Sequence, residues 1–255
     1  MSDDTATDVW GRMFADYHAG VGKPWTIRRD DGHLDEGDCT AAYVEPPLPE
    51  AEQDLLGRLK GRVLDIGCGP GRHLLWLQER GVEAVGIDFS PGTVEVARSR
   101  GCREVYVMDV AALDFPADSF DGVIMMGNNV GLAGTLEATE ELFRILHRMV
   151  RTGGLLVGQT RDPLATHDAA HLAYHAANRS RGLPPGRVRI RLEYDGMAGE
   201  WFDLLMLEPP ALVELLGRTG WDIEEILTGL DGGVTYIAAR CRARSERSGE
   251  TAHAS

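Results

Sequence analysis

The sequence is short of lysine and of positive charge, and this shortage argues against a nucleic-acid partner. Its 26 basic residues, of which only Lys23 and Lys60 are lysines, are outnumbered by 40 acidic residues, for a net charge of −14. Affinity for nucleic acid comes mostly from Lys and Arg that neutralise phosphates, so we expect no nucleic-acid partner. Three arginines, Arg187, Arg189 and Arg191, alternate along a predicted strand, and we interpret them as one solvated strand face.

Long apolar runs and paired cysteines are also lacking. No run approaches the roughly 20 apolar residues of a membrane span, and the acidic N-terminus does not resemble a signal peptide, so we expect a cytoplasmic protein with no membrane partner. The four cysteines, Cys39, Cys68, Cys102 and Cys241, form no CxxC pair. Zinc sites and disulfide frameworks need closer or patterned spacing, so we predict free thiols in a reducing compartment.

Apolar runs typical of strands alternate with helical patterns along most of the chain. This alternation favours βαβ units and a largely parallel sheet, which is the α/β class. Ser90 is expected to cap the helix that begins at Pro91. The expected helices are 9–19, one that ends near 60, 71–80, 91–99, 135–150 and 210–219, and the expected strands are 62–66, 84–88, 105–108, 122–126, 154–159, 221–227 and 234–239.

The alternation breaks between residues 161 and 207. A His-rich helical segment is followed there by a Pro-Pro-Gly turn and by strands at 188–194 and 201–207, which we interpret as a hairpin. The chain therefore divides into an N-terminal helical lid segment (1–48), a core (49–160 and 208–241), an inserted substrate cap of helix and hairpin (161–207) and a disordered tail (242–255). The hairpin at 187–207 is a candidate dimer surface, so a monomer and a homodimer both stay open.

One short segment points to the chemistry. The run Asp65-x-Gly67-x-Gly69-x-Gly71 follows an apolar strand and opens a helix. Glycines at alternate positions let the backbone turn tightly and let a ligand approach it closely. The dinucleotide fingerprint G-x-G-x-x-G would need its third glycine at the position of Arg72, so a nicotinamide oxidoreductase is disfavoured.

Polar residues end the predicted strands that follow. Asp88 ends the second strand, where an acid can accept both hydroxyls of a ribose, and Asp109 follows the third. The fourth strand leads into Asn128 and Asn129. Ligands of open α/β sheets bind outside the carboxyl ends of the strands, so these segments define one expected binding edge.

Together these segments resemble class I S-adenosylmethionine-dependent methyltransferases, with a methyltransferase domain of type 11 or 25. The Gly-rich run resembles their motif I, Asp88 their ribose-binding acid and Asp109-Val110 their adenine-binding pair, and the resemblance covers roughly residues 50–160 and the last two strands. It implies a Rossmann-like, doubly wound sheet of seven mostly parallel strands with a C-terminal antiparallel strand. It also implies S-adenosyl-L-methionine as the cofactor.

The resemblance implies roles for individual residues. Asp65 orients the cofactor's ammonium group, Asp88 binds its ribose and Asp109 accepts its adenine amino group. Asn128 faces the methyl group, whereas His73 is either a cofactor contact or a helix-surface imidazole. The complete set implied for the cofactor is Asp65, Gly67, Cys68, Gly69, Gly71, His73, Asp88, Phe89, Asp109, Val110 and Asn128, with Gly67 and Gly69 against the methionine end and Phe89 against the adenine.

Three histidines at four-residue spacing mark the inserted segment. His167, His171 and His175 would share one stripe of a helix, beside Tyr174. Three interpretations stay open: a solvated helix face, a substrate-binding or basic face, and a metal pair. No flanking carboxylate pattern strengthens the metal interpretation, so no metal ligand is predicted. The candidate catalytic residues are His171, Tyr174 and Asn128, and the candidate substrate-binding residues are Tyr17, Trp25, Asn129, His167 and His175.

The expected reaction is in-line transfer of a methyl group to O, N or C of a small-molecule acceptor, with S-adenosyl-L-homocysteine as the product. A peptide or protein acceptor is the alternative, and a non-catalytic cofactor-binding protein is the alternative of another class. The run Gly127-Asn128-Asn129-Val130 departs from the Asn-Pro-Pro-Tyr motif of many amide and nucleobase N-methyltransferases. This departure disfavours methylation of DNA bases.

Overall fold

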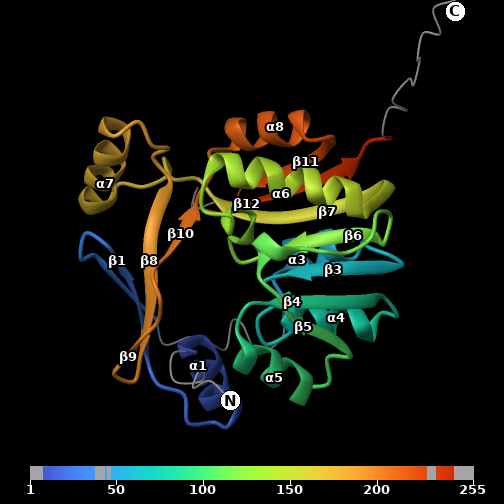
Figure 1. Ribbon diagram of the computed structural model, residues 1–255, viewed down its shortest axis with the longest axis horizontal. Helices are drawn as coiled ribbons and strands as arrows, with labels where there is room; N and C mark the ends of the chain where they lie inside the picture. The colour runs from blue at the N-terminus through green and yellow to red at the C-terminus, as the bar shows by residue number, and fades with distance from the viewer. Residues whose placement is uncertain (1–7, 38–43, 45–46, 229–233, 244–255) are drawn as a thin grey trace, which may run out of the picture.

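Two β-sheets organise the computed structural model of the chain, which describes residues 8–37, 44, 47–228 and 234–243 (Figure 1). The larger sheet has seven strands in the order β11-β12-β7-β6-β3-β4-β5. The strands are β3 (Arg62–Ile66), β4 (Glu83–Asp88), β5 (Glu104–Val107), β6 (Phe120–Met125), β7 (Val150–Arg161), β11 (Trp221–Thr228) and β12 (Val234–Cys241). Strands β7, β6, β3, β4 and β5 pair in parallel, whereas β12 is antiparallel to both of its neighbours. The predicted Rossmann-like sheet is thereby confirmed.

Helices cover both faces of this sheet. On one face pack α3 (Glu50–Leu56), α4 (Arg72–Glu79) and α5 (Pro91–Ser99), and on the other α6 (Leu136–Met149) and α8 (Pro209–Arg218). Successive side chains of a strand point to opposite faces, so Val63 joins the first layer and Leu64 the second. The hydroxyl of Ser90 accepts the N–H of Thr93 at 3.0 Å, so the predicted cap of α5 is confirmed.

The second sheet, here called the side sheet, has the order β10-β8-β1-β2, with β9 paired to β8. Its strands are β1 (Trp25–Arg29), β2 (Leu34–Gly37), β8 (Arg187–Tyr194), β9 (Met197–Ala198) and β10 (Phe202–Leu205). The side sheet stands beside the carboxyl ends of the parallel strands of the large sheet, where β3 ends. Helix α7 (Ala169–Ser180) lies at one end of the side sheet (Figure 1). All its pairings are antiparallel.

The side sheet corrects the predicted N-terminal segment. The segment 1–48 is predicted as a helical lid whose helix is 9–19, but beyond α1 (Val9–His18) the chain forms β1 and β2. These strands are short and mostly polar, and the alternation of Trp25 and Ile27 with polar residues in β1 is too brief to identify a strand from sequence. They exist because β1 pairs with β8, far along the chain, where the guanidinium of Arg28 donates two hydrogen bonds to the Glu193 carboxylate. The predicted cap strands therefore belong to one sheet with the N-terminal segment.

The thiol prediction holds for the part of the chain that the structure describes. The thiols of Cys68 and Cys102 are buried and free, and Cys241 is buried as well. Cys39 lies outside the described residues, as do residues 244–255 of the predicted disordered tail. Among the described helices, none is both long and apolar enough to cross a membrane.

The carboxylate of Asp8 fastens α1 to the start of α5. It accepts the backbone N–H of Gly11 at 2.9 Å and that of Gly92 at 2.8 Å, and it accepts the Ser90 hydroxyl at 2.7 Å. The two helix starts also touch, because a Cβ on Gly11 would lie 2.6 Å from Cα of Gly92. One side chain thus satisfies backbone donors at the N-termini of two helices.

We expect Asp8→Ala to lower the free energy of unfolding by about 2 kcal/mol, because three donors lose their acceptor. Urea unfolding measures the loss, and hydrogen exchange of the α1 amides should accelerate in the variant. Glu95→Ala, which removes an exposed carboxylate of α5, is the matched control and should change neither measurement. Unchanged exchange in α1 of Asp8→Ala would show that this carboxylate does not hold the helix.

Candidate functional site

The loop between β3 and α4 carries the three glycines. All have positive φ, +68° at Gly67, +55° at Gly69 and +85° at Gly71, which L side chains rarely adopt. A Cβ on Gly67 would lie 2.5 Å from Nδ2 of Asn129, and one on Gly71 would lie 2.2 Å from Sγ of Cys102, so packing requires both glycines. A Cβ on Gly69 would meet no described atom within 4 Å. A ligand can therefore approach the backbone closely at Gly69.

Two asparagines follow β6 at the start of η3 (Asn129–Gly131). The Asn129 amide donates to the carbonyls of Ile66 and Gly67, at 2.8 and 2.9 Å. Oδ1 of Asn128 accepts the backbone N–H of Arg161 at 3.1 Å, and the Asn128 backbone has a φ of +73°. The predicted substrate residue Asn129 therefore braces the glycine loop, and the side-chain oxygen of Asn128 is turned toward the end of β7.

Asp65 is a buried carboxylate at the end of β3. It is 1% exposed, and within the described residues its Oδ2 atom has no hydrogen-bond partner. Burial raises its pKa to about 7; the charge of His73 opposes this rise and that of Asp88 adds to it. Such a group favours a cation beside it, because a cation would stabilise the ionised form.

The imidazole of His73 joins Asp65 to a second buried acid, Glu52 of α3. Its Nδ1 lies 4.0 Å from Oδ2 of Asp65, and its Nε2 lies 3.4 Å from Oε2 of Glu52. The Tyr236 hydroxyl also donates to Glu52, at 3.4 Å. Sequence reasoning missed Glu52 and Tyr236, because neither stands in a motif and only the docking of α3 and β12 brings them to this edge.

Asp88 ends β4 beside the glycine loop, as predicted. Its Oδ2 accepts the N–H of Gly69 and its Oδ1 accepts the N–H of Ser90, both at 3.0 Å. Burial raises its pKa to about 6, although these two hydrogen bonds oppose the rise. Each carboxylate oxygen has a second lone pair, so Asp88 can still accept from a ligand. The next residue, Phe89, is 58% exposed.

The other residues implied for the cofactor have different environments. Asp109 is exposed and caps η2 (Val110–Ala112) by accepting the N–H of Ala111 at 2.8 Å. Val110 packs against the buried core under α6 and α8. The Cys68 side chain is buried beneath the loop, and burial raises the pKa of its thiol well above the ordinary value. Cys68 therefore offers a ligand its backbone and not its sulfur.

The two aromatic residues predicted for the substrate pack on glycines. A Cβ on Gly22 would lie 2.2 Å from the Tyr17 ring, and one on Gly37 would lie 2.2 Å from the Trp25 ring. Trp25 also packs against the apolar cluster that α1 and β8 share. Within the described residues its buried Nε1 donor has no hydrogen-bond partner.

The histidine stripe is corrected by the position of α7. The helix begins at Ala169 with Asp168 as its N-cap, so His167 precedes it and is exposed. Aspartate is a favoured N-cap, and because Asp168 starts the helix after His167, only His171 and His175 of the predicted stripe lie on it. His175 is 3% exposed, and its Nδ1 has no partner among the described residues. Burial and the nearby Arg179 lower the pKa of His175, which is therefore neutral at pH 7.

The three candidate catalytic residues do not meet in one constellation within the described chain. The Tyr174 hydroxyl donates to Asp30 at 2.8 Å, and the Arg29 guanidinium lies over its ring. Nε2 of His171 lies 3.2 Å from Nε2 of His33, on the β1–β2 turn. Asn128, by contrast, is bonded to the end of β7. Tyr174 and His171 thus connect α7 to the side sheet.

Comparison with known proteins identifies a domain within the large sheet. The model of the methyltransferase-domain family matches residues 63–154. A malonyl-[acyl-carrier protein] O-methyltransferase of Salmonella typhimurium is 34% identical over 107 residues, which cover 42% of this chain and 41% of that protein. A probable tRNA methyltransferase 9B of mouse is 34% identical over 113 residues, which cover 43% of this chain and 24% of that protein. The chain thus spans less than half the length of these two relatives.

A solved structure resembles nearly the whole chain. It is an S-adenosylmethionine-dependent methyltransferase from Bacteroides fragilis in complex with S-adenosyl-L-homocysteine. The two chains superpose with a TM-score of 0.79 at 24% identity, over 93% of this chain and 96% of the other. The likeness therefore extends beyond residues 63–154 to the fold of the side sheet.

We expect Asp65→Asn to stabilise the ligand-free protein at about pH 8. Because the pKa of Asp65 is higher in the folded state, its neutral form persists on folding at low pH, and stability falls as pH rises from about 4 through 7. The gain should approach at most about 4 kcal/mol above pH 7 and vanish near pH 4. Urea unfolding at several pH values measures it, with exposed Asp109→Asn as the control. A gain that does not depend on pH would contradict the assigned burial cost.

Proposed function

We propose that this chain, whose residues 63–154 match the methyltransferase-domain family, is a class I S-adenosylmethionine-dependent methyltransferase that transfers a methyl group to a small-molecule acceptor. The cofactor of this enzyme family is S-adenosyl-L-methionine. The observation that carries the proposal is the combination of a buried Asp65 carboxylate, whose Oδ2 has no hydrogen-bond partner within the described residues, with open backbone at Gly69 and a strand-end acid at Asp88. Each of these features suits one part of that cofactor.

The residues at this edge fit the cofactor chemically. The methionine end of the cofactor carries an ammonium group and a sulfonium. Asp65, with Glu52 nearby, offers buried negative charge to the ammonium group. Asp88 has lone pairs for the ribose hydroxyls. We assign the adenine end to Asp109 and to the exposed ring of Phe89, which stand beside β4 and β5.

The cofactor, when bound, supplies a methyl group activated on sulfur, and in-line displacement leaves S-adenosyl-L-homocysteine. The chain's own task is to orient the acceptor and to exclude water. The backbone at Gly69 and the carboxylates of Asp65 and Asp88 fix the donor side. The acceptor's lone pair then has to face the methyl group, opposite to the bond that breaks.

We place the acceptor beside the side sheet and α7. Trp25 Nε1, near the α1 end of the side sheet, and His175 Nδ1, in α7 at its other end, are buried polar atoms without a partner in the described residues, so either one can hydrogen-bond an acceptor. His175 is also neutral at pH 7 and can accept a proton if the acceptor must lose one. Tyr174 and His171, the earlier catalytic candidates, are engaged with Asp30 and His33. We therefore prefer His175 for this role.

The charge distribution supports a small acceptor over a nucleic acid. Two of the three alternating arginines of β8 are paired with carboxylates, Arg187 with Asp203 and Arg191 with Glu193. The chain's net charge of −14 opposes phosphate binding as well. A peptide or protein acceptor is the second proposal.

The cell compartment is a separate point: the buried free thiols favour a reducing, cytoplasmic compartment.

We expect wild-type protein to bind S-adenosyl-L-methionine and S-adenosyl-L-homocysteine in calorimetry. Asp88→Asn should weaken both by about 1–3 kcal/mol, roughly five- to 150-fold in Kd, because the ribose loses an ionised acceptor. Asp114→Asn removes an exposed carboxylate on the loop after β5 and should leave both affinities unchanged. Failure of folded wild-type protein to bind either ligand would sink the proposal.

The acceptor class is tested by following a labelled methyl group. Wild-type protein with methyl-labelled cofactor is mixed separately with a small-molecule extract and with a macromolecular fraction of the same cells. We expect label in the small-molecule fraction only, and less of it with Asp88→Asn when the cofactor is subsaturating. Label in protein alone would favour the second proposal, label in nucleic acid would contradict the charge argument, and binding without any transfer would indicate a non-catalytic protein.

A further inference from the structure

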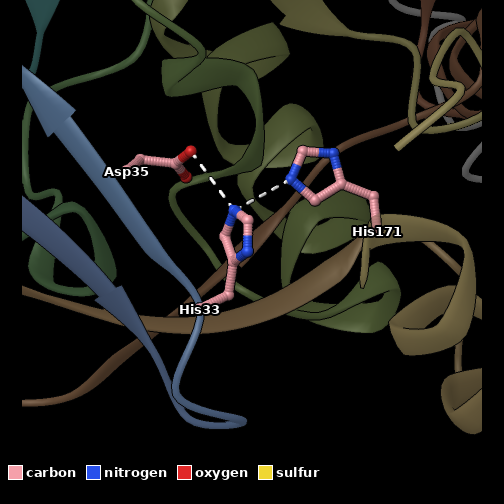
Figure 2. A group of neighbouring side chains, drawn as sticks. All are labelled: His33, Asp35 and His171. Carbon is pink, nitrogen blue, oxygen red and sulfur yellow. Dashed lines mark hydrogen bonds and ion pairs between the residues drawn. The ribbon is translucent and has the colours of Figure 1, made fainter. Parts of the chain in front are cut away.

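Three side chains from two distant segments meet where the β1–β2 turn touches the first turn of α7. Nε2 of His33 lies 3.2 Å from Nε2 of His171 and 3.4 Å from Oδ1 of Asp35. Figure 2 shows the imidazole of His33 between the other two groups. One ligand atom from each residue lies within 4.8 Å of those of the other two.

Local hydrogen bonds hold the β1–β2 turn in place. The carboxylate of Asp31 accepts the backbone N–H of His33 at 3.2 Å and two hydrogen bonds from the Arg29 guanidinium at 2.8 Å. Arg29 also donates to the carbonyl of Ala170 in α7, at 3.3 Å. The turn and the helix are therefore positioned by contacts that do not involve the three clustered groups.

The ring of His171 is oriented by a neighbour. Its Nδ1 lies 3.2 Å from the hydroxyl oxygen of Thr166, and its backbone N–H donates to the cap Asp168 at 3.1 Å. The Thr166 contact engages Nδ1 and leaves Nε2 turned toward His33. A polar partner on the second ring nitrogen is the usual support of a metal-ligating histidine.

We infer that His33, Asp35 and His171 bind one divalent transition-metal ion, with Zn²⁺ as the best match. Nitrogen and oxygen ligands about 2.0–2.1 Å from a tetrahedral ion lie about 3.3 Å from one another. The two distances around His33 match this spacing, and the ligand atoms of His171 and Asp35, which lie within 4.8 Å of each other, would draw closer around the ion. Two imidazoles and one carboxylate suit Zn²⁺, Co²⁺ or Ni²⁺ and leave at least one position for water.

The ion would join two parts of the chain that the sequence keeps far apart. His33 and Asp35 stand at the β1–β2 turn, whereas His171 belongs to α7. The ligand set differs from the pair of histidines four residues apart that the sequence left open as one interpretation, because His171 finds its partners on the side sheet and not along its own helix. Since the unfolded chain does not preform this site, bound metal should stabilise the fold. The inference is independent of methyl transfer.

The test uses the full chain, stripped of metal by a chelator and dialysed against Zn²⁺. We expect one Zn²⁺ per chain and a higher melting temperature with the metal than without it. His171→Ala and Asp35→Asn should each weaken binding at least about tenfold and abolish most of the thermal shift. His167→Ala removes an exposed histidine just before α7 and should bind as wild type does. Asp35 is largely exposed, so its variant is expected to fold normally.

Two outcomes would overturn the inference. The first is folded wild-type protein that binds no Zn²⁺, or Zn²⁺ binding that survives unchanged in His171→Ala and Asp35→Asn; the cluster would then be only hydrogen-bonded. The second is a Co²⁺ complex whose absorption spectrum shows thiolate ligation, which would assign the metal to a cysteine. A Co²⁺ spectrum of nitrogen and oxygen ligands, lost in both variants, would support the inference.

Discussion

A relay of two carboxylates and one hydroxyl ties the glycine loop to the rest of the molecule. Asp88 accepts the N–H groups of Gly69 and Ser90, and the Ser90 hydroxyl donates to Asp8, which caps α1 at Gly11. The loop, the start of α5 and the N-terminal helix are thereby fixed to one another. The candidate site for the methyl donor depends on this chain of hydrogen bonds, because the hydrogen bonds fix the direction in which the open backbone at Gly69 faces.

The same edge of the sheet accumulates buried negative charge. Asp65, Asp88 and Glu52 are all buried, with one imidazole, His73, among them. Burial raises the pKa of both Asp65 and Asp88, which means that the folded protein resists their ionisation. A fold that keeps such groups is less stable than one with apolar residues there, and the cost is explained if a cationic ligand is bound at this edge.

The large sheet and its helices could be predicted because their signals lie in residues that are neighbours in sequence. Alternating strands and helices, the cap at Ser90 and the acid at the end of β4 all follow from neighbours in sequence. The side sheet could not be predicted in this way: the polar strand β1 forms by pairing with β8, and His33 meets His171 only after that pairing. Asp168 shows a further limit, since this N-cap starts α7 after His167 and leaves only His171 and His175 of the expected stripe on the helix. Glu52 had no sequence signal at all.

The side sheet combines strands from distant parts of the chain, and this affects how the protein folds during synthesis. Strands β1 and β2 leave the ribosome early, but β8 and β10, which complete their sheet, are synthesised only after the large sheet's first five strands. The βαβ core can therefore fold while the N-terminal strands still lack their partner. Until β8 emerges, β1 is an unpaired edge strand in the nascent chain. The charged residues at its end, Arg28 and Arg29, and those that follow it, Asp30 and Asp31, disfavour premature pairing with other chains.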